Sequence, residues 1–280
     1  MPIAVTGSTG RLGGRVARRL ASAGIVQRLV VRDPARAPSL DHAVAVRAEY
    51  RDSGAARRAL TGTRTVFMVS GAEAVDRVDQ HRTFIDAAVT AGVEHLVYTS
   101  FFGAASDATF TLARDHHATE QHIRASGLHW TFLRDNMYLD FFPYLAGQDG
   151  VIRGPAGDGR IAAVAQDDIA DVAVAVLSAP GDHAGRTYDL TGPEAISLAE
   201  AAATITAVTG RTVTYHAETV EEAYDSRAHY GAPDWQVEAW VSTYTAIAAG
   251  ELDGVTDHVA LVTDQQPLSL EQLLRTIRAE

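Results

Sequence analysis

Short apolar runs alternate with amphipathic segments along the first half of the chain. The apolar runs predict buried strands, and the segments with apolar positions three or four residues apart predict helices. We expect strands at residues 3–5, 27–31, 44–48, 65–69, 96–99 and 129–134, with helices starting near residue 11 and at 53–60, 75–91 and 111–126. Strands and helices that alternate in this way indicate an α/β fold with a parallel sheet, covered by crossover helices on both faces.

The pattern changes near residue 147, where a turn-rich stretch begins. A further helix at 168–177 and a strand at 187–190 follow. Capping-box patterns then open three helices, at Ser197 with Glu200, Thr219 with Glu222, and Ser269 with Gln272. Trp235, Trp240 and Tyr244 share a helix expected after Pro233. We therefore expect a main domain over residues 1–146, to which 161–191 return, and a smaller C-terminal α/β lobe over most of 147–280.

Three glycines separate the first strand from the first helix. Gly7 would make the tight turn, Gly10 would let a pyrophosphate approach the backbone, and Gly13 would let the helix pack closely on the sheet. The free N–H groups at the helix start and the helix dipole would then bind the anion. The position favours a dinucleotide site in a doubly wound Rossmann sheet, although the spacing is G-x-x-G-x-x-G. A glycine-rich turn without a ligand is the alternative.

The ends of the next strands supply further candidate contacts. Arg32 follows the second strand, where an arginine favours the 2′-phosphate of NADP, while the adjacent Asp33 keeps NAD open. Tyr50 follows the third strand and would flank the adenine. Ser70 and Gly71 follow the fourth strand, over the expected cofactor groove. These positions make NADP the expected cofactor, with NAD second.

Composition narrows the possible functions. The 280 residues are 46% apolar and carry a net charge of −11, which argues against nucleic acid or an anionic membrane as the main partner. The chain has no cysteine, and no apolar run approaches the roughly 18 residues of a membrane span. The N-terminus leads directly into the first strand, so we expect a cytoplasmic protein without a signal peptide. All 24 basic residues are arginine, which excludes mechanisms that need a lysine.

Several stretches together resemble a known family. TGSTGRLG, VVRDPAR, HRTFIDAAVTAGVEHLVYTS, ASGLHWTFLRDNMY and AGDGRIAAVAQDDIADVAVAVL look like the atypical short-chain dehydrogenases of the NmrA-like branch. Within it, the chain is similar to the NAD(P)H:quinone oxidoreductase type 2 and triphenylmethane dye reductase group. The resemblance covers nearly the whole chain. It implies an NADP-binding Rossmann domain and a small C-terminal lobe with the substrate between them.

The resemblance also implies positions for the cofactor contacts. The phosphate loop falls on Gly7, Ser8, Thr9, Gly10, Arg11, Leu12 and Gly13, and the arginine for the 2′-phosphate on Arg32. Contacts from the fourth and fifth strands fall near Val69, Ser70, Thr99 and Ser100, and Asn136 lies where the family backbone meets the nicotinamide carboxamide.

Ordinary short-chain dehydrogenases carry Tyr-x-x-x-Lys on the helix after the fifth strand. Here the matching place reads from His116 to Glu120, so both catalytic residues are missing, as in the quinone reductase group. Quinones and cationic dyes are strong electrophiles, so positioning them beside a nicotinamide would suffice, with solvent completing proton transfer. His116, as a proton donor, Glu120 and Tyr138 are the candidate catalytic residues.

His116 and Glu120 are four residues apart and share a helix face, which also allows a surface His–Glu pair. Tyr138, with Phe141 and Phe142, would line the substrate cleft, although core packing explains the phenylalanines equally well. His116, His117, Glu120 and His122 lack the spacing of a zinc site, and we expect no metal.

The leading hypothesis is an NADPH-dependent oxidoreductase that transfers hydride to a small aromatic electrophile, a quinone first, as a monomer or homodimer. A redox-sensing protein that binds NAD(P) without turnover is the first alternative, because the missing dyad fits it too. The second is a biosynthetic reductase of a ketone, imine or enone, with His116 or Tyr98 as the acid.

Overall fold

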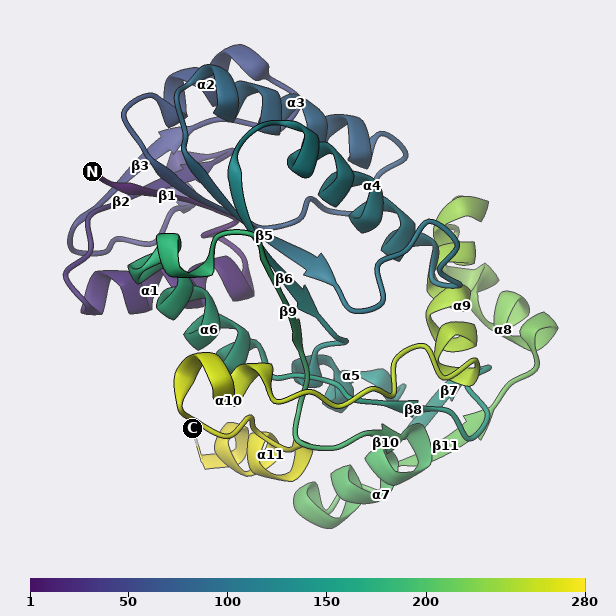
Figure 1. The fold of residues 1–280 in the computed structure, drawn as a ribbon. Helices are drawn as coiled ribbons and strands as arrows, with labels where there is room; N and C mark the ends of the chain where they lie inside the picture. The colour runs from purple at the N-terminus through teal and green to yellow at the C-terminus, as the bar shows by residue number, and fades with distance from the viewer. Residues whose placement is uncertain (280) are drawn as a thin grey trace.

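A parallel sheet of seven strands forms the centre of the molecule (Figure 1). The computed structural model describes residues 1–279. The strand order is β3-β2-β1-β4-β5-β6-β9, and every neighbouring pair is parallel. The strands are β1 (Ile3–Thr6), β2 (Gln27–Val31), β3 (Ala43–Arg47), β4 (Thr65–Met68), β5 (His95–Phe101), β6 (His129–Asp135) and β9 (Arg186–Leu190). This doubly wound Rossmann arrangement confirms the expected fold class.

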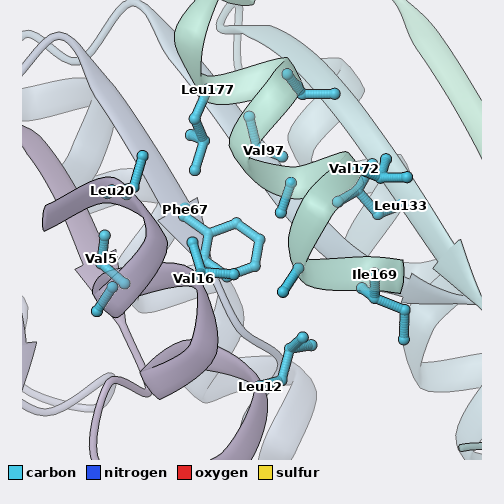
Figure 2. Packing of buried hydrophobic residues seen from close by; sticks show 14 of the residues in the cluster. Val5, Leu12, Val16, Leu20, Phe67, Val97, Leu133, Ile169, Val172 and Leu177 are labelled. Carbon is cyan, nitrogen blue, oxygen red and sulfur yellow. The ribbon is translucent and has the colours of Figure 1, made fainter. Parts of the chain in front are cut away.

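Successive residues of a strand point to opposite sides of the sheet, so a strand of apolar residues has two apolar faces. Helices cover both of them. Val5 packs under α1 (Arg11–Ser22) and α6 (Gln166–Ser178), whereas its neighbour Ala4 packs under the opposite layer. Figure 2 shows Val16 of α1 and Ile169 of α6 on either side of Phe67. The opposite layer consists of α2 (Ser53–Leu60), α3 (Arg77–Thr90) and α4 (Thr111–Ala125).

Two features of α3 differ from the sequence prediction. The helix begins at Arg77 rather than at residue 75, and Val75 is exposed in the preceding loop. The apolar spacing of this segment predicts that Val89 is buried with the rest of the helix face, but Val89 is 41% exposed because it faces away from the sheet. The loop that replaces the first expected helical turn lies at the carboxyl end of β4, where it borders the cofactor groove.

A smaller group of elements lies beside the carboxyl ends of the central strands (Figure 1). It contains one parallel and one antiparallel pair of strands, β7–β11 and β8–β10. Its elements are α5 (Phe142–Leu145), β7 (Val151–Gly154), β8 (Arg160–Ile161), β10 (Ile196–Ser197), α7 (Leu198–Thr209), β11 (Thr214–Ala217), α8 (Val220–Arg227), α9 (Asp234–Ala248) and α11 (Leu270–Ala279). The expected capping boxes are present at Ser197, Thr219 and Ser269.

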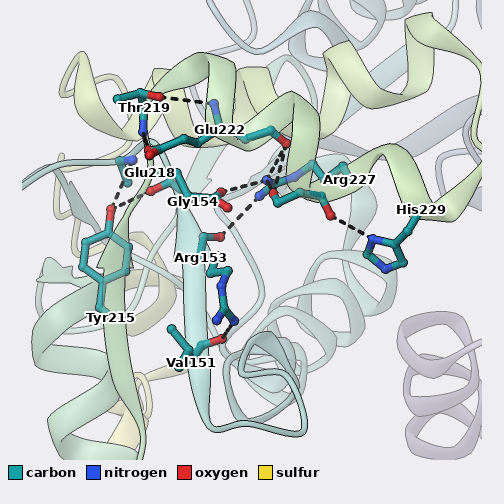
Figure 3. Close-up of polar contacts among 12 residues, drawn as sticks. Val151, Arg153, Gly154, Tyr215, Glu218, Thr219, Glu222, Arg227 and His229 are labelled. Carbon is teal, nitrogen blue, oxygen red and sulfur yellow. Dashed lines mark hydrogen bonds and ion pairs between the residues drawn. The ribbon is translucent and has the colours of Figure 1, made fainter.

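Within this smaller group, buried contacts fix α8 and α9 to β7. The Arg227 guanidinium of α8 donates to Glu218 at 2.9 Å and to the Arg153 carbonyl of β7 at 3.3 Å (Figure 3). A side chain at Gly154 would collide with the ring of Tyr244, so glycine permits the close approach of α9 to β7. This packing holds α9 against β7.

The last part of the chain returns to the main sheet. Helix α10 (His258–Thr263) packs on α6 and β9, and the His258 ring accepts a hydrogen bond from the Asp189 N–H at 2.9 Å. The described chain then ends in α11, which packs on α7 in the smaller group. The two parts of the molecule are therefore joined by several crossings of the chain.

Candidate active site

The loop between β1 and α1 has the geometry of a phosphate-binding turn. Gly7 has a φ of +65°, and its carbonyl accepts the Gly10 N–H at 2.8 Å. A Cβ on Gly13 would lie 2.5 Å from the Gly7 carbonyl carbon and 2.8 Å from the Thr6 oxygen, so only glycine lets α1 approach this closely. These two glycines have the roles that the sequence suggested for them.

The same loop fits a dinucleotide phosphate. Gly10 is the N-cap of α1, and no side chain caps the helix, so its first N–H groups and its dipole are suited to an anion. Ser8 is buried, and its hydroxyl is without a hydrogen-bond partner among the described residues. An orphaned hydroxyl beside an uncapped helix start is the arrangement expected where a ligand supplies the missing partner.

A cavity of 380 Å³ extends from this loop across the carboxyl ends of β1 and β4. The strand order reverses there, which is where ligands bind in doubly wound sheets. Seven of the expected cofactor residues line it: Gly7, Thr9, Arg32, Tyr50, Val69, Ser70 and Gly71. Arg51, which follows Tyr50 in the stretch after the third strand, lines it as well. Asp33 does not line the cavity, because its carboxylate caps the next turn by accepting the Ala35 N–H at 3.0 Å.

The other expected cofactor residues lie around this cavity rather than on its surface. Leu12 packs in the core below α1. The Thr99 hydroxyl accepts the Ser70 N–H at 2.8 Å and so holds the cavity edge in place. Ser100 and Asn136 line a second cavity, which is described below. Gly10 and Arg11 are exposed at the start of α1.

Tyr50 forms part of the groove floor. Its hydroxyl donates to the Val69 carbonyl at 2.5 Å and lies 2.6 Å from the Thr6 hydroxyl, so it bridges the ends of β1 and β4. Its ring packs against Phe84, and burial raises the pKa of Tyr50 above its ordinary value. The phenol is therefore protonated and structural, and one face of its ring borders the groove.

A buried arginine, Arg77, connects the groove to α4. It is 4% exposed and donates to the Gly71 carbonyl at 2.9 Å and to His116 Nε2 at 2.9 Å. An arginine cannot accept a hydrogen bond, so His116 Nε2 is the acceptor and the ring proton lies on Nδ1, which donates to the Tyr98 hydroxyl at 3.0 Å. Burial, and then the nearby Arg77, lower the pKa of His116 well below its ordinary value.

This arrangement corrects the expectations for His116. The ring is neutral, and both of its nitrogens are engaged within the protein, so it has no proton to deliver to a substrate. A surface pair with Glu120 is also wrong, because both residues are buried and Glu120 binds elsewhere. Tyr98, the alternative acid, is fully buried behind His116, and burial raises its pKa.

His81 repeats the same pattern one turn after Arg77. Its Nε2 accepts the Gly71 N–H at 2.8 Å, and its Nδ1 lies 2.9 Å from the Thr119 hydroxyl. Burial and Arg77 lower the pKa of His81 to about 3, so this ring is neutral too. Arg77 and His81 thus hold both backbone groups of Gly71. Sequence reasoning missed the pair, although their separation by four residues on one helix was a usable signal.

Glu120 stabilises the end of the sheet and does not line either cavity. Its carboxylate accepts two hydrogen bonds from Arg134, at 2.8 and 2.7 Å, and one from the Ser100 hydroxyl at 2.6 Å. It therefore has no free oxygen facing a substrate. A catalytic role for Glu120 has no support in this geometry.

A second cavity of 370 Å³ adjoins the first. Ser70 and Glu73 line both, so the two cavities are neighbours that share part of their walls. Its apolar wall consists of Phe101, Phe110, Leu112, Met137 and Phe141, with Thr243 from α9. Glu73 is also tied to α9, because its carboxylate accepts hydrogen bonds from Gln236 at 2.8 Å and from the Trp240 indole at 3.3 Å. Phe142, in contrast, is fully buried in the core and is not a cleft residue.

The polar wall of the second cavity combines expected and unexpected residues. His116, Asn136 and Tyr138 line it as expected, and so does Asp135, which sequence reasoning missed. The Tyr138 hydroxyl donates to Asp135 Oδ2 at 3.2 Å. Burial raises the pKa of both groups well above their ordinary values. This second cavity is therefore aromatic, with a small cluster of buried polar groups at one end.

Comparison with known proteins shows the family to which the chain belongs. A family model described as NAD(P)H-binding matches residues 7–180, and the chain belongs to that family. The protein is an NAD(P)H-dependent oxidoreductase with an NmrA-like atypical short-chain dehydrogenase fold.

Individual relatives agree with this class. The chain is 34% identical to an NAD(P)H azoreductase of Xenophilus azovorans, over 93% of this chain and 92% of the relative. An NADPH-dependent quinone oxidoreductase from Escherichia coli, solved with NADPH, has a TM-score of 0.90 at 30% identity over 99% of each chain. A Citrobacter sp. triphenylmethane reductase has a TM-score of 0.88 at 27% identity over 100% of each chain.

Within residues 1–279, none of the helices combines the length and the apolar character that crossing a membrane requires.

Proposed function

We propose that this protein transfers hydride from NADPH to small aromatic electrophiles, with quinones as the leading substrate class. The observation that carries the proposal is that the two cavities adjoin, with Ser70 and Glu73 in the walls of both. A dinucleotide laid from the Gly7 loop along the first cavity would bring its nicotinamide to the entrance of the second. The aromatic wall there suits a flat ring substrate.

The arginines at the far end of the groove support NADPH over NADH. Arg32 and Arg51 line the end of the cavity beside β2 and β3, where the adenosine ribose of a bound dinucleotide would lie. Two guanidinium groups suit a 2′-phosphate. Asp33, the residue that would accept the hydroxyls of an unphosphorylated ribose, caps a turn instead.

The chain's own residues would position the substrate rather than activate it through a Tyr/Lys pair. When bound, a nicotinamide supplies the hydride. The wall from Phe101 to Phe141 would hold the acceptor ring and exclude water, and the smaller lobe within 147–280 would close the cavity through α9. Arg77 and His81 would keep Gly71 in a fixed position beside the nicotinamide, which is the positioning that hydride transfer requires.

The test is NADPH consumption with and without benzoquinone, with NADH in parallel. We expect quinone-dependent consumption that is faster with NADPH. Gly10→Trp is the site variant, because Gly10 is exposed at the start of α1. A Cβ there would lie 3.2 Å from the Gly7 backbone oxygen, a tight contact, so the variant is first checked for native circular dichroism. It should then lose turnover. A wild-type protein that binds NADPH but consumes none with any aromatic electrophile would contradict the proposal and favour the redox-sensing alternative.

A further inference from the structure

Asp135 is a buried carboxyl group in the wall of the substrate cavity. It is the last residue of β6, paired in register with Phe101 of β5 and Leu190 of β9, so it lies at the carboxyl end of the sheet. It is 1% exposed and lines the second cavity. Its Oδ2 accepts from Tyr138, whereas its Oδ1 is buried and has no hydrogen-bond partner among residues 1–279.

The surroundings of Asp135 favour its neutral, protonated form. The adjacent strands present Phe101 and Leu190, neither of which titrates. The titratable groups that share the cavity wall are Tyr138, the neutral His116 and Glu73. None of these brings a positive charge to the carboxyl group. Desolvation therefore dominates and raises the pKa of Asp135 well above its ordinary value, with the Tyr138 hydrogen bond acting weakly against it.

We propose that Asp135 is the proton donor of the reduction, with its carboxyl proton passing to the acceptor atom of the substrate and Tyr138 as the residue that positions the carboxyl group. This inference rests on the proposed function. The buried carboxyl replaces both the missing Tyr/Lys pair and the solvent as the source of the proton.

The step balances for a quinone with NAD(P)H as reductant. Hydride forms an O–H bond at one quinone oxygen as the C4–H bond of the dihydronicotinamide breaks, which gives a hydroquinone monoanion. The O–H bond of the Asp135 carboxyl group then breaks, and its proton bonds to the second oxygen. Hydroquinone leaves, and a proton from solvent restores the acid, so that quinone, NADPH and one proton give hydroquinone and NADP⁺.

A cationic triphenylmethane dye provides a chemical control for this step. Hydride addition to its central carbocation gives the neutral leuco dye directly, and no proton is needed. A proton donor therefore matters for the quinone and not for the dye. A residue that only shapes the cavity would affect both acceptors.

The first experiment compares Asp135→Asn with the wild type on benzoquinone and on crystal violet. Asparagine keeps the size of the side chain and an acceptor for Tyr138, but it has no proton to transfer. We expect kcat/KM for the quinone to fall about 10²-fold, the low end for general acid catalysis, and that for the dye to stay unchanged. Asp168→Asn is the matched control, because Asp168 is also buried but bonds the Leu268 N–H away from the cavity, and both activities should persist.

The outcomes separate the inference from the proposed function. Equal losses with both acceptors, or no loss with the quinone, would overturn the role of Asp135. A wild type inactive with both acceptors would contradict the proposed function instead. The protonation of Asp135 is then tested by a measurement that needs no turnover.

That readout is the infrared carbonyl band of a protonated carboxylic acid, measured at pH 7.5 in the protein alone. We expect a band in the wild type that is missing in Asp135→Asn. Identical spectra for the two proteins would show an ionised carboxylate and overturn the inference.

The pH dependence of the quinone rate tests the protonation of Asp135 during turnover. The quinone rate should fall as pH rises through the pKa of Asp135, and Tyr138→Phe should move this fall to higher pH, because it removes the hydrogen bond that favours the carboxylate.

Discussion

Substituting Gly13 with alanine tests how the phosphate loop is built. Gly13 lies in the first turn of α1, which packs directly on the turn at Gly7. The added Cβ would lie 2.5 Å from the Gly7 carbonyl carbon and 2.8 Å from the Thr6 oxygen. Both partners are backbone atoms and cannot rotate away, so α1 or the loop must move. The Gly7 carbonyl also accepts the Gly10 N–H, so the movement would disturb the whole turn.

The expected cost follows from two opposing effects. Adding a methyl group to tightly packed structure costs about 1–3 kcal/mol. Replacing glycine by alanine in a helix gains about 1 kcal/mol. Because the overlap is with backbone, we place the steric cost near its upper value and expect a net loss of about 2 kcal/mol of unfolding free energy. The displaced loop should also weaken NADPH binding at least tenfold, which corresponds to about 1.4 kcal/mol.

The assay is urea unfolding together with fluorescence titration of NADPH. Gly54→Ala is the matched control, since Gly54 lies in the first turn of α2 and its Cβ would make only ordinary contacts, at 3.4 Å and beyond. The control should keep wild-type affinity and lose no stability. A Gly13→Ala protein with wild-type stability and affinity would refute the close-packing argument.

Two further predictions concern charged residues. Arg32→Ala should weaken NADPH binding about tenfold or more, because a charge-assisted hydrogen bond contributes roughly 1.5–3 kcal/mol, and should leave NADH binding unchanged; equal losses for both cofactors in titrations would contradict the 2′-phosphate assignment. Desolvation raises the pKa of Asp168 from 3.8 to about 6, so the folded state favours the protonated form and stability falls, by at most about 3 kcal/mol, as pH rises between these values. Asp168→Asn, which keeps an acceptor for Leu268, should therefore be more stable than the wild type at pH 8 but not at pH 4. Urea unfolding at the two pH values checks this, and an equal gain at both would show that the charge is not the cause.

The sequence predicted most of the main sheet because its signals are local. Each strand is a short apolar run, and each helix has its own apolar spacing and its own start or stop residues, such as Gly24 with a φ of +70° after α1. The glycine loop was recognisable for the same reason. The pairing of the short strands in the smaller group, and the return of α10 to the main sheet, depend on contacts between distant segments and have no local signal.

The polar residues around the substrate cavity were harder to interpret for a related reason. His116 looked like a proton donor while only its spacing from Glu120 was known. Its actual partners, Arg77 and Tyr98, come from α3 and β5, and together with burial they determine its protonation. Asp135 was missed from the sequence, because its burial depends on the strands on either side of it.

The most direct test of the account is deuterium transfer from NADPH labelled at C4 to a cationic triphenylmethane dye. If the two cavities form one site, hydride passes directly between the ligands, and the leuco dye should carry deuterium on its central carbon. A leuco dye that contains only hydrogen from solvent would contradict the account, and so would a protein that binds both ligands without reducing the dye.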